Sequence, residues 1–140
     1  MTRADRLLLA GVVLYVVLSG IHGVVHGIVP VTIPAWQFAL VVVALFALPL
    51  TGGVLVVRGR GRTGAWLVLL GTVAGLAFEV VAHFLVDNPD HVSQVGHAAF
   101  APTAVGSALG TALAALSAGW YLRRHGQRGS HRSPLHAGTR

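Results

Sequence analysis

The stretch LLLAGVVLYVVLSGIHGVVHGIV, residues 7–29, decides the fold. It contains no acidic residue, no arginine and no lysine, and its only strongly polar side chains are two histidines four residues apart. A helix rises ~1.5 Å per residue, so a run of this length is sufficient to cross a hydrocarbon core of about 30 Å. We therefore interpret residues 7–29 as a transmembrane helix.

Three more apolar runs follow the first, at residues 35–57, 64–86 and 92–122. Hydrophobic residues make up 54% of the 140 residues, and the mean hydropathy is +0.73, which is too apolar for a soluble domain of this size. We predict an all-α fold, a four-helix transmembrane bundle with up-down-up-down topology in residues 1–122. Residues 123–140 are expected to form a disordered, basic cytoplasmic tail.

A weak internal repeat relates the two halves of this predicted bundle. When the chain is shifted by 57 residues, His22 aligns with Glu79 and His26 aligns with His83. The first and third apolar runs then overlap, and a loop on the same side follows each of them. The pattern favours two repeated helical hairpins related by an axis along the membrane normal.

The arginines predict the topology. All ten basic residues are arginines, and they occur before the first span, between the second and third spans, and after the fourth: Arg3, Arg6, Arg58, Arg60, Arg62, Arg123, Arg124, Arg128, Arg132 and Arg140. The other two loops contain no arginine or lysine. The positive-inside rule therefore predicts a multi-pass protein of the cell membrane with both termini in the cytoplasm.

The same distribution bears on partners and on processing. Arginines placed in this way act as topology determinants that contact anionic lipid headgroups, so we expect the lipid bilayer as a partner and no nucleic acid.

The first apolar run continues to Val29 without a small-residue cleavage site before the histidines, which favours an uncleaved span over a signal peptide. The absence of cysteine excludes thiolate ligands and disulfides.

Polar residues recur at helical spacing on three of the four spans. Tyr15, Ser19, His22 and His26 follow a +4, +3, +4 pattern, which places them on one face of the first helix. The third and fourth spans carry similar stripes, with Thr72, Glu79 and His83 on the third and His97, Ser107 and Thr111 on the fourth. Polar groups in hydrocarbon are costly unless they are partnered, so these faces are expected to turn into the bundle.

The stripes converge on one layer in the outer half of the membrane. His22 and Glu79 lie ~10 Å below the outer ends of their helices, and His26 and His83 lie ~5 Å below them. His97 reaches the same layer if the fourth helix begins at Asn88-Pro89, a sequence typical of helix starts. Asp87, Asp90 and His91 are expected just above it.

Imidazole and carboxylate are the usual ligands of divalent transition metals. We therefore predict a metal site for an ion such as zinc, iron or copper(II). Its expected ligands are His22, His26, Glu79, His83 and His97. Glu79 is alternatively a candidate general base acting on metal-bound water. A catalytic triad or phosphate loop is not visible, so the sequence leaves it undecided whether the protein is an enzyme.

Three alternatives stay open from the sequence. The polar stripes can form a cofactor-free core in a structural or accessory subunit, which would pack against a membrane-complex partner or a second copy of the chain. Two histidines can hold haem b in an electron carrier, although the predicted outer side offers acids rather than cations to the haem propionates. The stripe can also conduct protons or a small solute.

The topology is testable with reporter fusions. The predicted topology places all ten arginines on the cytoplasmic side. A reporter that works only in the cytoplasm is therefore expected to be active when it is fused after Arg140. Activity of a reporter that works only outside the cell would overturn the topology, together with the assignment of the polar layer to the outer half.

Overall fold

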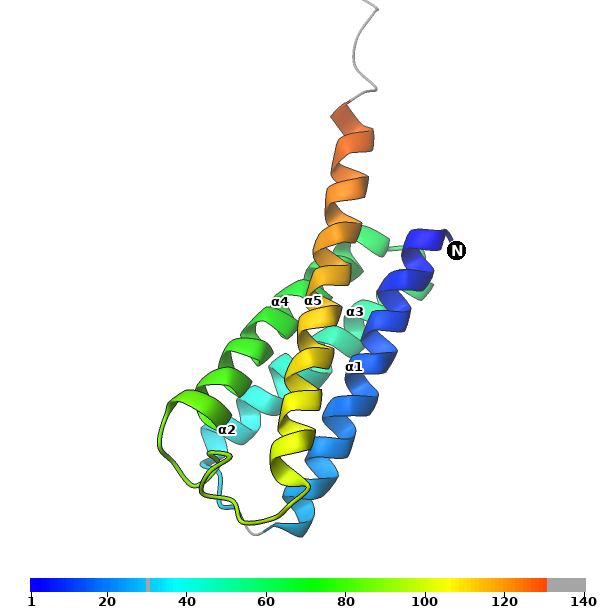
Figure 1. Ribbon diagram of the computed structural model, residues 1–140. Helices are drawn as coiled ribbons and strands as arrows, with labels where there is room; N and C mark the ends of the chain where they lie inside the picture. The colour runs from blue at the N-terminus through cyan, green and yellow to red at the C-terminus, as the bar shows by residue number, and fades with distance from the viewer. Residues whose placement is uncertain (30, 131–140) are drawn as a thin grey trace, which may run out of the picture.

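The computed structural model describes residues 1–29 and 31–130, and every element in this part of the chain is helical (Figure 1). Helix α1 is Arg3–Ile28, and the second span runs without interruption through α2 (Ala35–Leu40), the π-helical segment η1 (Val41–Ala47) and α3 (Leu48–Val57). The third span comprises α4 (Gly61–Val80) and a second π-helical segment, η2 (Val81–Leu85), and α5 is Phe100–Ser130.

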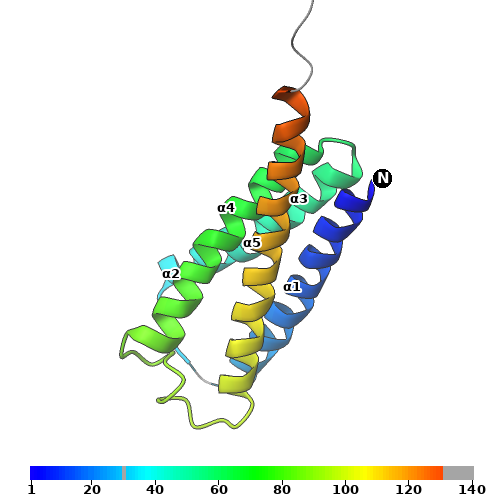
Figure 2. The ribbon, with the colours of Figure 1, turned by 45° about the horizontal axis from the view of Figure 1, so that its top comes forward.

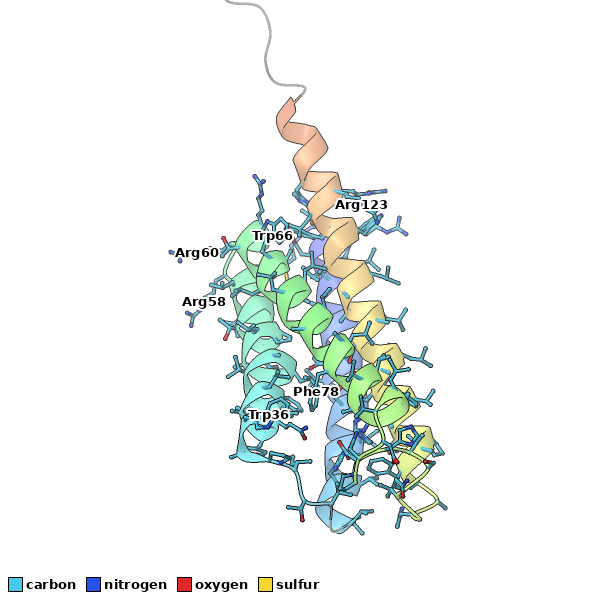
Figure 3. All side chains as sticks on the ribbon, turned by 90° about the vertical axis from the view of Figure 1, so that its left-hand side faces the viewer. Trp36, Arg58, Arg60, Trp66, Phe78 and Arg123 are labelled. Atoms are coloured by element: carbon cyan, nitrogen blue, oxygen red, sulfur yellow. The ribbon has the colours of Figure 1, made fainter. Side chains whose placement is uncertain are left out.

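The four spans form the predicted bundle. Each is long and apolar enough to cross a membrane, which identifies a membrane protein by the length and composition of its helices. Helix α1 packs along α5, α5 packs along α4, and α4 packs along α3 (Figures 1 and 2). The N-terminus, the α3–α4 turn and the far part of α5 lie at one end, where Figure 3 labels Arg58, Arg60 and Arg123. We call this the arginine end, and the end with loops 31–34 and 86–99 the loop end.

The start of α5 differs from the prediction. The helix begins at Phe100 rather than near Val92, and residues 86–99 form an irregular loop. Asn88 does not start a helix, because its side chain accepts a hydrogen bond from the Asp90 N–H and donates to the Ala82 carbonyl, which turns the chain back onto η2. The loop therefore folds over the bundle instead of extending the fourth helix.

The other end of α5 also differs from the prediction. A disordered tail was expected from Arg123, but the helix continues to Ser130. Residues 131–140, with His131 and His136, lie outside the described residues.

Close backbone contact joins α3 and α4 in the arginine half. A Cβ atom added to Gly52 would lie 2.6 Å from the Gly64 carbonyl oxygen, and one added to Gly64 would lie 2.4 Å from the Gly52 carbonyl oxygen. Two helices can approach this closely in a membrane only where both present small residues. An apolar core that includes Leu8, Val12 and Val68 fills the rest of this half.

A buried hydrogen bond marks the boundary between the apolar half and the polar half. Pro49 has no N–H, so it cannot donate to the Leu45 carbonyl four residues earlier in the helix. The hydroxyl of Tyr15, which is fully buried on α1, donates to that carbonyl instead. Because an unpaired carbonyl is costly in hydrocarbon, this bond allows a proline inside the second span.

The outward surface of the bundle is apolar. Large hydrophobic side chains such as Val13 (62% exposed), Val24 (65%) and Leu109 (59%) point away from the neighbouring helices. Such a surface suits lipid contact and would be unfavourable in water.

The Gly52–Gly64 contact generates a stability prediction. Gly52→Ala is expected to lower stability in detergent by about 1–3 kcal/mol, because the added methyl group overlaps the backbone of α4. Thermal unfolding measures the effect. The matched control is Gly53→Ala, whose Cβ would meet Val12 at an ordinary 3.6 Å. Equal stability of the two variants would contradict the packing.

Candidate metal centre

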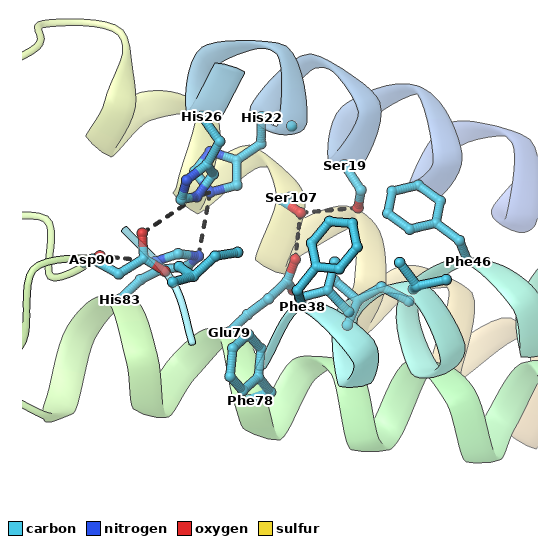
Figure 4. A pocket seen from close by; sticks show the side chains of 15 residues that line it. Ser19, His22, His26, Phe38, Phe46, Phe78, Glu79, His83, Asp90 and Ser107 are labelled. Atoms are coloured by element: carbon cyan, nitrogen blue, oxygen red, sulfur yellow. Dashed lines mark hydrogen bonds and ion pairs between the residues drawn. The ribbon is translucent and has the colours of Figure 1, made fainter. Parts of the chain in front are cut away.

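Three histidines meet at the loop end of the bundle (Figure 4). His22 and His26 lie one turn apart on α1, and His83 lies on η2. The Nε2 atom of His22 is 3.1 Å from Nε2 of His26 and 3.2 Å from Nε2 of His83. Each residue offers one nitrogen, and the three nitrogens lie within 4.8 Å of one another. This His22–His26–His83 group, which we call the histidine triad, has metal-ligand spacing.

An aromatic ring supports the triad from α5. The Phe100 ring is fully buried, and its centroid lies 5.1 Å from that of His22, 5.0 Å from His26 and 5.7 Å from His83. The ring restricts the three imidazoles to the observed arrangement. Sequence reasoning missed Phe100 because an apolar residue in an apolar segment carries no distinguishing pattern.

Hydrogen bonds on the far side of two rings determine their tautomers. Nδ1 of His22 lies 3.1 Å from Thr103 Oγ1, and the Thr103 hydroxyl already donates to the Ala99 carbonyl at 2.7 Å. Thr103 must therefore accept a hydrogen bond, so His22 carries its proton on Nδ1. Nδ1 of His83 lies 3.0 Å from the Asp90 carbonyl oxygen, which can only accept. His83 therefore also carries its proton on Nδ1.

The two tautomers leave lone pairs facing each other. In neutral imidazoles protonated on Nδ1, both Nε2 atoms are unprotonated, and those of His22 and His83 are only 3.2 Å apart. Such lone pairs repel unless a cation or a proton lies between them. Two nitrogens bound to one tetrahedral zinc at 2.0–2.1 Å are about 3.3 Å apart. Histidine ligands also typically donate their second N–H to a protein oxygen, as both rings do here.

Asp90 adds a negative charge to the histidine triad. Its carboxylate is buried in the loop, with Oδ1 3.4 Å from Nε2 of His26 and Oδ2 3.3 Å from Nδ1 of His83. Among the described residues, nothing forms a hydrogen bond with Asp90 Oδ1. Burial raises the pKa of the Asp90 carboxyl, and the nearby His83 and His26 act in the opposite direction. A bound cation would further favour the ionised carboxylate.

The loop that carries Asp90 is held on the end of η2. The Val92 N–H donates to the His83 carbonyl at 3.0 Å, and Asn88 Nδ2 donates to the Ala82 carbonyl at 2.9 Å. The last carbonyls of a helix lack helical partners, so they are available to receive the loop. These bonds bring Asp90 beside the histidine triad, whereas the sequence predicted a position just above that layer.

Glu79 lies next to the histidine triad but is not a member of it. The hydroxyl of Ser107 donates to its Oε1, and the hydroxyl of Thr111 donates to its Oε2 at 2.9 Å. Ser19 Oγ lies 2.9 Å from Ser107 Oγ and joins α1 to the same network. The buried carboxyl group therefore has hydroxyl partners in its own layer. Its assignment as a metal ligand or a general base stays a prediction.

His97 lies apart from the other predicted ligands. It is exposed in the loop before α5, and its Nδ1 accepts a hydrogen bond from the Ala99 N–H at 3.2 Å. The expectation that it enters the shared layer is corrected here, because that expectation required α5 to begin before His97. Of the five predicted residues, the structure brings His22, His26 and His83 together and places Glu79 in the adjoining layer.

A cavity of about 250 Å³ adjoins the histidine triad (Figure 4). Polar side chains line one part of it, and apolar side chains of α2, η1 and α4 line the rest. The lining residues are Ser19, His22, Gly23, His26, Ile33, Phe38, Val41, Val42, Leu45, Phe46, Phe78, Glu79, His83, Asp90 and Ser107.

No protein-family model matches this sequence, and comparison with curated proteins and with solved structures gives no significant match. Function is therefore inferred from the side chains and their geometry.

The tautomers can be tested directly. In metal-free protein in detergent at about pH 8, where imidazoles are mostly neutral, ¹⁵N NMR is expected to show His22 and His83 protonated on Nδ1. His97 provides the internal contrast, because its Nδ1 accepts a hydrogen bond and its proton must be on Nε2. Histidine-to-alanine variants assign the signals. Protonation of His22 and His83 on Nε2 would remove the facing lone pairs from the site.

Proposed function

We propose that this membrane protein binds one divalent transition-metal ion through the Nε2 atoms of His22, His26 and His83. The observation that carries the proposal is the 3.2 Å approach of two Nε2 atoms whose protons are placed on Nδ1 by other partners. Imidazole suits zinc, iron and copper(II), and the sequence has no cysteine to favour a softer ion. Asp90 balances part of the charge of the ion and orients His83.

The proposed ion lies in the outer half of the membrane. If the arginine end faces the cytoplasm, as the positive-inside rule predicts, the loop end faces outward, both termini are cytoplasmic and the membrane is the cell membrane. Asp87 and Asp90 lie in the outer loop, which contains no arginine or lysine. Their negative charge attracts cations toward the histidine triad.

The contact distances favour an ion over haem b. A haem held by two histidines places the plane of its macrocycle between the two ligating nitrogens. The Nε2 atoms of His22 and His83 are already in contact, and so are those of His22 and His26. A single ion requires much less movement of these rings.

The second candidate is a structural or accessory subunit with a cofactor-free polar core. It is favoured by the Glu79 network, in which hydroxyl donors from α5 meet a carboxyl acceptor on α4 without any further group. Interhelical bonds of this kind are worth roughly 0.6 kcal/mol each and fix helix register. Metal analysis of purified protein separates the two candidates.

His26→Ala and His83→Ala are each expected to abolish stoichiometric metal binding. Each substitution removes one of three proposed ligands, from different helices. The measurement is the metal content per chain after incubation of detergent-purified protein with Zn²⁺ and desalting, supported by calorimetric titration. Wild-type binding is expected to weaken once the pH is low enough to protonate the imidazoles, because a protonated imidazole cannot ligate.

His97→Ala is the matched control, since it removes an exposed histidine from the adjoining loop and should leave one ion per chain. His131→Ala, outside the described residues, and Glu79→Gln should do the same. The site would be refuted if the metal content stayed the same in His26→Ala, in His83→Ala and at low pH. Near-zero metal in every variant, with lowered thermal stability of the histidine variants, would favour the cofactor-free core.

A further inference from the structure

The cavity next to the histidine triad has two chemically different parts. His22, His83 and Glu79 contribute nitrogen and oxygen atoms along one side (Figure 4). The opposite side is formed by hydrocarbon side chains, among them Phe38 and Phe46. A pocket that is apolar with a few convergent polar groups is typical of small-molecule sites. This one fits a molecule with an apolar body and a single polar group.

The size and the rim of the cavity narrow the class of ligand. Its volume of about 250 Å³ is slightly below the range of roughly 300–1,000 Å³ for drug-sized ligands, so it accommodates a small molecule rather than a helix or a peptide. Gly23, Phe38 and Val42 line the cavity and are also exposed, with Phe38 58% and Val42 43% exposed. These positions lie within membrane spans, so the rim opens toward lipid.

Gly23 leaves space that the protein itself does not fill. A Cβ added there would have no atom of the described residues within 4 Å, as at Gly20 and Gly27 on the same helix, whereas the packed glycines Gly52 and Gly64 meet a backbone oxygen. Gly23 follows His22 directly in the sequence and lines the same cavity. A glycine at such a position allows a ligand to approach the helix backbone closely.

We propose that this cavity binds a small lipophilic molecule, an alkyl or aryl body bearing a metal-ligating oxygen group, that enters from the bilayer. The inference rests on the proposed metal function, because the ion supplies the partner for the oxygen group. Three imidazole ligands leave a coordination position open on a tetrahedral ion. Each carboxylate oxygen of Glu79 can accept a second hydrogen bond, so the carboxyl group can also receive a donor on the ligand.

A photoreactive hydroxamate tests the proposal. The probe is octanohydroxamic acid with a diazirine on its chain, added to full-length, Zn²⁺-loaded protein in nanodiscs. After illumination, mass spectrometry is expected to locate the label on the cavity wall formed by Phe38, Val42 and Leu45. Removal of Zn²⁺, or an excess of unlabelled octanohydroxamic acid, should reduce this labelling at least ten-fold.

Two cavity-filling variants and a matched control sharpen the test. Gly23→Leu should reduce cavity labelling at least ten-fold while one zinc ion per chain is retained. Val42→Trp fills the cavity from the opposite wall and should act in the same way if Gly23→Leu fails to fold. Gly119→Leu should leave labelling unchanged, because Gly119 lies in the arginine half of α5 and its Cβ would likewise meet no described atom within 4 Å.

The outcomes separate this inference from the metal proposal. One outcome would overturn the lipophilic site alone. In that outcome the protein binds stoichiometric zinc, the label is spread over lipid-facing residues such as Val13 and Leu109, and neither Gly23→Leu nor Val42→Trp changes the labelling. Cavity labelling that persists without Zn²⁺ would overturn the role of the ion in binding the oxygen group. Failure of the wild-type protein to bind zinc would overturn the proposed function and, with it, this inference.

Discussion

Every polar side chain that these helices carry into hydrocarbon must find its partner inside the bundle. The hydrophobic effect does not select the register of membrane helices, because lipid tails are as apolar as the side chains they contact. Register therefore depends on directional contacts. The Tyr15 hydroxyl joins α1 to the Leu45 carbonyl of η1, and Glu79 joins α4 to Ser107 and Thr111 of α5. With the close approach of Gly52 and Gly64, these bonds place His22, His26 and His83 at the same level.

The two polar layers differ in whether they are complete. Around Glu79, hydroxyl donors face carboxyl acceptors, and the layer is satisfied by the protein alone. Between His22 and His83, acceptor faces acceptor, while the donors of both rings point outward to Thr103 and Asp90. A layer of the first kind fixes the fold, and a layer of the second kind is suited to an additional positive species. This difference favours ion binding at the histidines, whereas the hydroxyl network holds α4 to α5.

Helical periodicity accounts for what the sequence could predict. The length of each apolar run predicts its span, and the +4, +3, +4 spacing on α1 correctly turns Ser19 and His22 inward. The start of α5 could not be predicted, because residues 92–99 contain no strong helix breaker except Gly96. The turn that excludes them depends on hydrogen bonds from Asn88 and Val92 to the carbonyls of η2, which the local pattern does not encode. That one difference displaced His97 from the expected layer and concealed the approach of Asp90. The π-helical segments η1 and η2 could not be predicted either, because they do not change the pattern of apolar residues.

The loop that carries Asp90 governs how long a bound ion would stay. The histidines lie on α1 and η2, and separating these helices would require unfolding of the bundle. The adjoining cavity meets hydrocarbon, which is unfavourable for a charged ion, so the remaining cover is a short segment held by a few hydrogen bonds, among them those from Val92 to His83 and from Asn88 to Ala82. Such segments open locally at a small fraction of the global unfolding free energy. The residence time of the ion would therefore follow the opening rate of this loop, and a substitution at Asn88 could change exchange kinetics without altering any ligand.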